Sequence, residues 1–360
     1  MPSHGGGGRK SPSVCFIYID QGPQKKKLSL DTLVRDVDIN AMIKLLLPLV
    51  LLCLSLTSCE QSPNDITDLL QAAELGDAKA QSNLGVAYYY GEGVAENTVE
   101  AVKWWRQAAE QGYAKAQYNL GELYYYGGVV PEDDAEALKW YGKAAEQGYV
   151  NAQFALGVMY DNGEGVPEDD TEAVKWYRKA ANQGDASAQH SLGFMYEYGE
   201  GVAEDYVEAV KWYCKAADQG YADAQYSLGV MYADGEGVAE DDAAAVKWFQ
   251  KAAYQGDAMA QFSLGVMYAD GEGVVEDYTE AVKWFSKAAE QGYAEAQVNL
   301  AVMYSAAGDY VTSYKWLNIA AAQGNERAKK AKGLITEEMA KEQIAEAQKL
   351  SREWLAKRSK

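Results

Sequence analysis

The chain has 360 residues, with 33 Lys and Arg against 53 Asp and Glu, and its formal net charge is −20 at pH 7. This acidic balance argues against a nucleic-acid-binding protein, because binding to phosphates requires clustered cations. The two histidines, His4 and His190, are too few for a histidine metal site or a histidine cluster, so the composition gives little support to catalysis.

Residues 1–41 share no pattern with the rest of the chain. They contain four consecutive glycines from Gly5 and the basic run Lys25 to Lys27. We interpret them as a non-native upstream extension or a disordered segment, with translation starting at Met42. The alternative is a genuine cytosolic extension whose basic run lies at a membrane surface.

Residues 42–59 have the pattern of a lipoprotein signal peptide. Lys44 precedes an apolar run from Leu45 to Leu56, which is too short to span a bilayer but suits the apolar region of a signal peptide. The following Leu-Thr-Ser-Cys resembles the bacterial lipobox, which implies that Cys59 is cleaved, lipid-modified and the first mature residue. The residue after Cys59 is Glu60 rather than Asp, which resembles the sequence of lipoproteins that are sorted to the outer membrane. Alternatively, Cys59 ends an uncleaved hydrophobic anchor.

After this segment we expect a short tether at 60–65, a capping helix at 66–77 and a repeat array at 78–325. A pattern recurs every 36 residues, and self-similarity at such a period predicts a solenoid. The seven units are 78–113, 114–149, 150–185, 186–221, 222–257, 258–293 and 294–325.

Each unit predicts two helices. Ala152, Leu156 and Tyr160 follow a helical period, and a second stripe includes Trp176 and Tyr177. A capping box of Asp followed three residues later by Glu marks the second helix in four units, and Gln-Gly marks its end. The predicted fold class is all-α: a right-handed α-solenoid superhelix of antiparallel helix pairs.

Two further positions predict close packing between the helices. A tryptophan recurs at one position of every unit, and we interpret it as a packing wedge rather than a ligand cage. The helix-interior glycines, such as Gly157, predict the close approach of a neighbouring backbone, since glycine weakens a helix by about 1 kcal/mol. The tryptophans are Trp104, Trp140, Trp176, Trp212, Trp248, Trp284 and Trp316.

Residues 326–360 are predicted to close the array with capping helices, the last starting near Thr336 and presenting Ile344, Ala347, Leu350 and Trp354 on one side. After processing, only Cys59 and Cys214 would remain, so no disulfide is expected in the mature monomer. We expect Cys214 to be an exposed thiol.

The unit pattern Ala-x-Ala-Gln-x-x-Leu-Gly-x-x-Tyr, followed by Gly-x-Gly-Val and Glu-Ala-Val-Lys-Trp-x-x-Lys-Ala-Ala-x-Gln-Gly, resembles the Sel1-like repeats, relatives of the tetratricopeptide repeat. The resemblance covers residues 78–325. It implies an all-helical superhelix that serves as an adaptor in protein complexes, commonly in bacterial signalling, secretion and host interaction.

The first helices carry a second stripe, at unit positions 5, 9 and 12, that the predicted core does not use. Aromatic residues with polar neighbours are typical of a protein or peptide groove. The alternative is that these rings pack against the next unit. The predicted groove residues are Tyr118, Asn119, Phe154, His190, Tyr226 and Phe262.

The sequence therefore favours a membrane-anchored interaction scaffold in the bacterial cell envelope, on the periplasmic face of the outer membrane. We expect no enzyme activity and no cofactor or metal, since the acidic turns lack the ligand spacing of a calcium loop. The expected partner is a protein or peptide, favoured to be basic. A hydrolase, as suggested for cysteine-rich Sel1-like relatives, and support of polysaccharide export are the alternatives.

Overall fold

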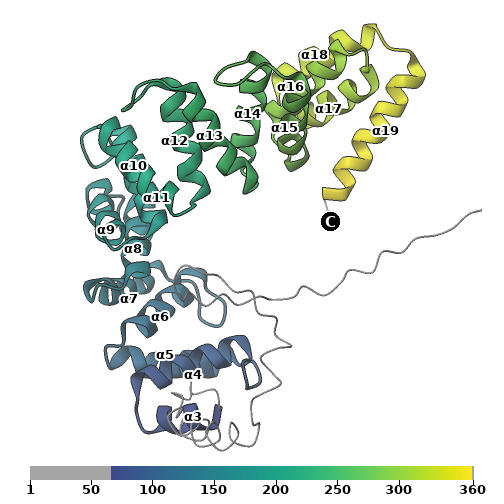
Figure 1. Ribbon diagram of the computed structural model, residues 1–360. Coiled ribbons are helices and arrows are strands. Elements are labelled where there is room, and N and C mark those ends of the chain that lie inside the picture. Colours follow the sequence, from purple (N-terminus) through teal and green to yellow (C-terminus); the bar gives the residue numbers. More distant parts are fainter. Residues whose placement is uncertain (1–65, 359–360) are drawn as a thin grey trace, which may run out of the picture. The chain divides into compact units, whose positions relative to one another are not determined.

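The computed structural model describes residues 66–358, and the predicted extension, signal peptide, lipid-attachment Cys59 and tether lie outside them. This part of the chain contains 17 helices and no strand (Figure 1). No helix in it is both long enough and apolar enough to cross a bilayer. The helices are α3 (Ile66–Glu74), α4 (Ala78–Tyr90), α5 (Thr98–Glu110), α6 (Ala114–Tyr126), α7 (Asp134–Glu146), α8 (Val150–Asn162), α9 (Asp170–Asn182), α10 (Ala186–Tyr198), α11 (Tyr206–Asp218), α12 (Ala222–Asp234), α13 (Asp242–Tyr254), α14 (Ala258–Asp270), α15 (Tyr278–Gln291), α16 (Ala294–Ala306), α17 (Tyr310–Ala322), α18 (Glu326–Glu337) and α19 (Lys341–Arg358).

The repeats form helical hairpins in series. Helices α4 and α5 pair, and the same pairing continues through α16 and α17. The second helix of each hairpin also contacts the first helix of the next one, for example α7 with α8 and α9 with α10. Each unit therefore buries its apolar side chains against its neighbours, and the predicted all-α solenoid is confirmed.

The second helices begin at a capped residue, as the sequence predicts. The Asp169 carboxylate accepts a hydrogen bond from the Glu172 amide at 3.0 Å. The reciprocal half of the predicted capping box is wrong, because the Asp169 amide already donates to the Tyr160 carbonyl of the preceding helix at 2.9 Å. Glu172 instead pairs with Lys175 at 2.6 Å. At the far end Gly184 has a φ of 98°, the left-handed conformation predicted there.

The helix-interior glycines make room for an aromatic ring, which corrects the prediction of a close backbone. A Cβ placed on Gly229 would lie 2.5 Å from Cδ1 and 2.6 Å from Cε1 of Phe249. The same arrangement recurs in the six units that have such a glycine. The rings that cover them belong to Trp105, Tyr141, Tyr177, Tyr213, Phe249 and Phe285, all buried.

The ring that packs on the glycine comes one residue after the recurrent tryptophan, so the predicted wedge is only partly right. Trp140, Trp212, Trp284 and Trp316 are buried, whereas Trp104, Trp176 and Trp248 are half-buried. A lysine three residues further along lies over several of these indoles, for example Lys179 with its Nζ 3.5 Å from the Trp176 ring centroid. The tryptophans therefore line the outer side of the second helix as well as the core.

Buried glutamines connect successive units by hydrogen bonds. The Gln153 amide donates to the Ala145 carbonyl in the last turn of α7 at 3.1 Å, and its oxygen accepts from Gln183 at 2.7 Å. Each bond satisfies a polar group that would be costly to bury alone. The ladder runs through the whole array, at Gln81, Gln117, Gln153, Gln189, Gln225, Gln261 and Gln297.

Helix α19 packs against α17 at the C-terminal end of the array. The Trp354 indole donates to the Glu290 carboxylate at 2.7 Å, and its ring meets Trp316 edge-on at 5.8 Å. The last helix starts at Lys341, later than the predicted Thr336, because α18 continues to Glu337. The Gln343 side chain then accepts a hydrogen bond from the Ala340 amide at 2.9 Å and caps the new helix.

Candidate partner-binding groove

The predicted groove residues at unit position 5 occupy equivalent places on successive first helices. Each ring is half-buried and lies against the glycine-packed ring of its own hairpin. The centroid distances are 5.6 Å for Tyr118–Tyr141, 5.8 Å for Phe154–Tyr177, 5.4 Å for His190–Tyr213, 5.7 Å for Tyr226–Phe249 and 5.8 Å for Phe262–Phe285. We call this row of rings the first-helix face.

Some of these rings also pack toward the following unit, which was the alternative interpretation. Tyr118 lies 5.3 Å from Tyr149 and Phe262 lies 5.2 Å from Tyr293, the last residue of each unit, directly before the next first helix. His190 reaches the following unit itself, with its Nε2 3.3 Å from the Ser227 hydroxyl. The groove interpretation and the packing interpretation are compatible, because each ring is half-buried and part of it remains exposed. The assignment of these residues to partner binding remains a prediction.

Three units carry a carboxylate at this face, hydrogen-bonded to the buried tyrosine. The hydrogen bonds run from the phenol to the carboxylate: Tyr141 to Glu122 at 2.6 Å, Tyr177 to Asp161 at 3.0 Å, and Tyr213 to Glu197 at 2.5 Å. Burial raises the pKa of all three phenols, and the neighbouring carboxylates raise it further. The phenols therefore remain protonated hydrogen-bond donors to the acids.

The fifth and sixth units lack these pairs. Phe249 and Phe285 replace the tyrosines, and the positions of the acids are taken by Val230, Ala233, Val266 and Ala269. The first-helix face thus carries its phenol-held acids in its N-terminal half, the second to fourth units. In its C-terminal half the acids are Asp234 and Asp270, which stand where the second unit has Tyr126. The sequence analysis missed this division, although the joint change from Tyr to Phe and from acid to Val or Ala could have shown it.

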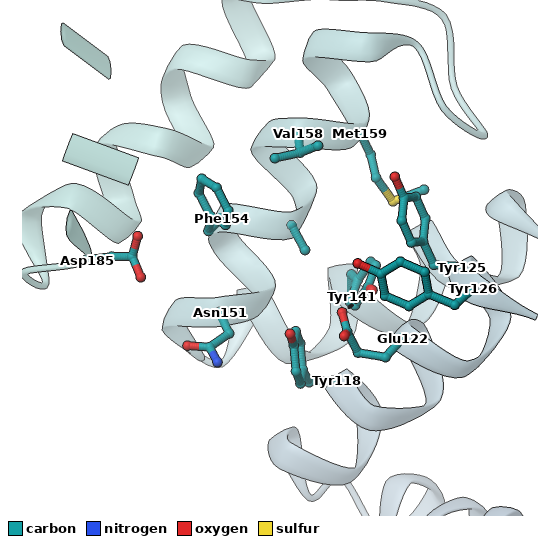
Figure 2. A pocket seen from close by; sticks show the side chains of 11 residues that line it. Tyr118, Glu122, Tyr125, Tyr126, Tyr141, Asn151, Phe154, Val158, Met159 and Asp185 are labelled. Atoms are coloured by element: carbon teal, nitrogen blue, oxygen red, sulfur yellow. Dashed lines mark hydrogen bonds between the residues drawn. The ribbon is translucent and has the colours of Figure 1, made fainter. Parts of the chain in front are cut away.

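Two hollows lie on the N-terminal half. One has a volume of about 350 Å³ and is lined by α6, α8, Tyr141 and Asp185 (Figure 2). The other, about 380 Å³, lies between α4 and α6 and includes Asn119, another predicted groove residue. Tyr118, Glu122 and Tyr126 line both hollows. A smaller hollow of about 240 Å³ lies on the C-terminal half, beside Val266, Asp270 and Phe285.

His190 is the one histidine among the described residues, and it belongs to the ring row. Burial lowers its pKa, partly offset by the carboxylates of Asp223 and Glu197, so the ring is neutral at neutral pH. Its Nε2 lies 3.3 Å from the Ser227 hydroxyl. The hydrogen bonds of residues 66–358 include none from His190 to a carboxylate, the third member of a hydrolytic triad.

Cys214 differs from its prediction as an exposed thiol. It is half-buried and packs at the edge of the core of the fourth and fifth units. Burial raises the pKa of the thiol, with a further contribution from Asp218. The thiol is therefore less reactive than a freely exposed one.

Comparison with known proteins places the chain in one family. The model of the Sel1 repeat matches residues 78–113, 114–149, 150–185, 186–221, 222–257, 258–293 and 294–325. No curated protein gives a match.

Solved structures agree with this match. The chain is similar to a protective antigen of uropathogenic Escherichia coli, with 41% identity, a TM-score of 0.73, and coverage of 80% of this chain and 64% of that one. It is also similar to a Sel1 repeat protein from Oxalobacter formigenes, with 37% identity, a TM-score of 0.62, and coverage of 76% of this chain and 81% of that one. The periodicity, the hairpins and these matches agree, and the chain belongs to the Sel1 repeat family.

Proposed function

We propose that this protein is an adaptor of the bacterial cell envelope that binds a protein or peptide partner along its first-helix face. Sel1 repeat solenoids typically act as scaffolds for protein–protein interaction. The observation that carries the proposal is the continuous row of half-open rings on successive first helices, from Tyr118 to Phe262. Aromatic side chains that are partly buried beforehand lose little freedom on binding and supply most of the contact energy in interfaces.

The charge of the chain favours a basic partner. The net charge is −20, and the phenol-held acids Glu122, Asp161 and Glu197 lie at the same face as the rings. An acidic surface accelerates the encounter with a basic protein and disfavours an acidic one. We therefore propose a partner segment whose basic residues lie against the phenol-held acids of the N-terminal half of the face.

The groove is tested by changing its rings together. The quadruple variant of Tyr118, Phe154, Tyr226 and Phe262 to Ser removes the anchors from both halves of the face. We expect the affinity for the partner to fall at least about tenfold, because each lost anchor is worth 1 kcal/mol or more. Affinity capture from membranes, followed by quantitative mass spectrometry, measures the change.

A matched control comes from exposed apolar residues elsewhere on the solenoid. Leu75, Val99, Val207 and Val275 lie on second helices or in turns and are 52–87% exposed. Changing these four to Ser removes a similar amount of apolar surface outside the first-helix face. Circular dichroism of both quadruple variants separates loss of binding from loss of fold, since the ring variant also loses packing on the buried rings.

We further propose that the protein is held at the outer membrane, on its periplasmic face, by a lipidated Cys59. The lipobox-like Leu-Thr-Ser-Cys motif supports this location. A related Escherichia coli protein is described as a protective antigen, which is consistent with a location in the cell envelope. Several acyl chains on one cysteine anchor a protein stably, whereas a single chain does so only marginally.

Metabolic labelling with radioactive palmitate in a bacterial host tests the anchor. We expect label in the wild type and none in Cys59→Ala, which should also leave the membrane fraction. Cys53→Ala is the matched control, because Leu52 before it is too large for lipobox processing, and it should keep the label. Label that persists in Cys59→Ala, or that never enters the wild type, would contradict the anchor.

A further inference from the structure

We infer that the hollow between α6 and α8 is a specific site for one cationic side chain, a lysine or an arginine, of the partner segment. This inference rests on the proposed function and names the chemistry that one part of the first-helix face recognises. We call the hollow the cation pocket and define it by Tyr118, Glu122, Tyr126, Phe154 and Asp185.

Five of the eleven residues that line the pocket are aromatic. Tyr118 and Tyr126 come from α6, Phe154 comes from α8, and the Tyr118 ring lies 5.6 Å from that of buried Tyr141 (Figure 2). Faces of aromatic rings attract cations, most strongly where water is partly excluded. The volume of about 350 Å³ is at the small end of ligand pockets, which suits a single long side chain rather than a broad surface.

The charge of the pocket is uncompensated. Glu122 and Asp185 are its ionisable acids, and no lysine or arginine is among the residues that line it. The Glu122 carboxylate accepts from the Tyr141 phenol at 2.6 Å and also hydrogen-bonds with Tyr118, and Asp185 accepts from the Ala188 amide at 2.7 Å. A carboxylate offers about four lone-pair sites, so both groups are fixed and keep acceptor capacity for a further donor. A bound ammonium or guanidinium would provide the missing positive charge and the missing donors.

Tyr125 holds another carboxylate, that of Glu164, at the edge of the pocket. Its phenol donates to Glu164, in the turn after α8, at 2.7 Å. That hydrogen bond raises the pKa of Tyr125 to about 12, so the phenol stays protonated and oriented. The pocket is thus bordered by carboxylates held in place on both of the units that build it.

The fifth unit supplies an internal comparison. Its equivalent positions hold Tyr226, Val230 and Phe249, which preserve the aromatic rings without a counterpart of Glu122, although Asp234 stands where the second unit has Tyr126. Met159, from the third unit, lines the cation pocket, and Met267 occupies the same position in the sixth unit, beside Phe249. The two methionine methyl groups therefore report on the same surface with and without a carboxylate held by a buried phenol.

Nuclear magnetic resonance of the full chain in mild detergent, with labelled methionine methyl groups, tests the pocket. The probes are the acetylated amides of arginine and lysine, with citrulline and norleucine as neutral counterparts. We expect arginine and lysine to shift the Met159 signal, assigned from Met159→Leu, much more than the Met267 signal. Glu122→Gln should weaken this binding about tenfold, as expected for the loss of a charged hydrogen-bond partner.

Glu197→Gln is the matched control, because it removes a carboxylate held by Tyr213 in the same way but outside the pocket, and it should leave the titration unchanged. Equal shifts with citrulline, equal shifts at Met267, or an unaltered titration in Glu122→Gln would overturn the inference. The titration needs no partner, so its failure would leave the adaptor function standing. Conversely, an unchanged partner list in the ring variant would remove that function without touching the pocket.

Discussion

Replacing Gly229 with alanine should destabilise the solenoid by about 1 kcal/mol net, although alanine is the better helix former. The added Cβ would stand 2.5 Å from the Phe249 ring and 3.0 Å from its Cγ, so the ring cannot move aside at its far end alone. Overpacking of this kind costs about 1–3 kcal/mol, which exceeds the helix-propensity gain of about 1 kcal/mol. Urea denaturation followed by far-ultraviolet circular dichroism measures the difference.

Gly142 in α7 provides the matched control. Nothing lies within 4 Å of the position that its Cβ would take, so Gly142→Ala should stabilise the protein by about 0.5–1 kcal/mol. The double variant Gly229→Ala with Phe249→Leu should lose less stability than the sum of the two single variants, because the smaller leucine removes the clash with the added Cβ and the Cβ fills part of the space that the ring leaves. A stabilising Gly229→Ala would mean that the ring does not need this glycine.

Truncating the ring that packs on the glycine should be more costly than truncating the tryptophan beside it. Tyr177 is 2% exposed, and its phenol donates to Asp161, whereas Trp176 is half-buried beneath Lys179. Tyr177→Ala should therefore cost about 4 kcal/mol, within the range for buried aromatic residues. Trp176→Ala should cost roughly 1–2 kcal/mol, because it loses partial burial and a cation–π contact.

The same denaturation measurement compares the two variants, and Tyr177→Phe separates packing from hydrogen bonding. The phenylalanine variant keeps the ring and loses the hydrogen bond to Asp161, so it should cost only about 1 kcal/mol. A larger loss of unfolding free energy in Trp176→Ala than in Tyr177→Ala would mean that the tryptophan is the main packing wedge, and would contradict the packing described above.

The architecture was predictable because it repeats. The period fixed the unit bounds, the apolar stripe of residues such as Leu156 indicated the first helix, and Asp169 marked the start of the second helix. Local signals of this kind act within a few residues of the chain. Helices can therefore be predicted from these local signals without knowledge of the tertiary contacts.

The contacts between helices were not predictable to the same degree. Gly157 in a helix interior indicates that another group packs closely against the helix, but the sequence does not say whether that group is a backbone or the Tyr177 ring. The buried glutamine ladder was missed for the same reason, since Gln153 meets its partners Ala145 and Gln183 only after the hairpins stack.

The candidate groove was predictable in its rings and not in its acids. Stripe position placed Tyr118 and Phe154 on one face from the sequence alone. The pairing of Glu122 with Tyr141 joins residues 19 positions apart on two helices, so it depends on how the hairpin closes. The cation pocket adds a third helix, α8, and follows from the stacking of neighbouring units.

Comparative capture with the two quadruple variants tests the central claim, that the first-helix face binds the partner. The account predicts the same captured protein with the wild type and with the Leu75, Val99, Val207 and Val275 variant, and at least about a tenfold loss with the Tyr118, Phe154, Tyr226 and Phe262 variant. A ring variant that remains helical and still captures an unchanged set of proteins would contradict it.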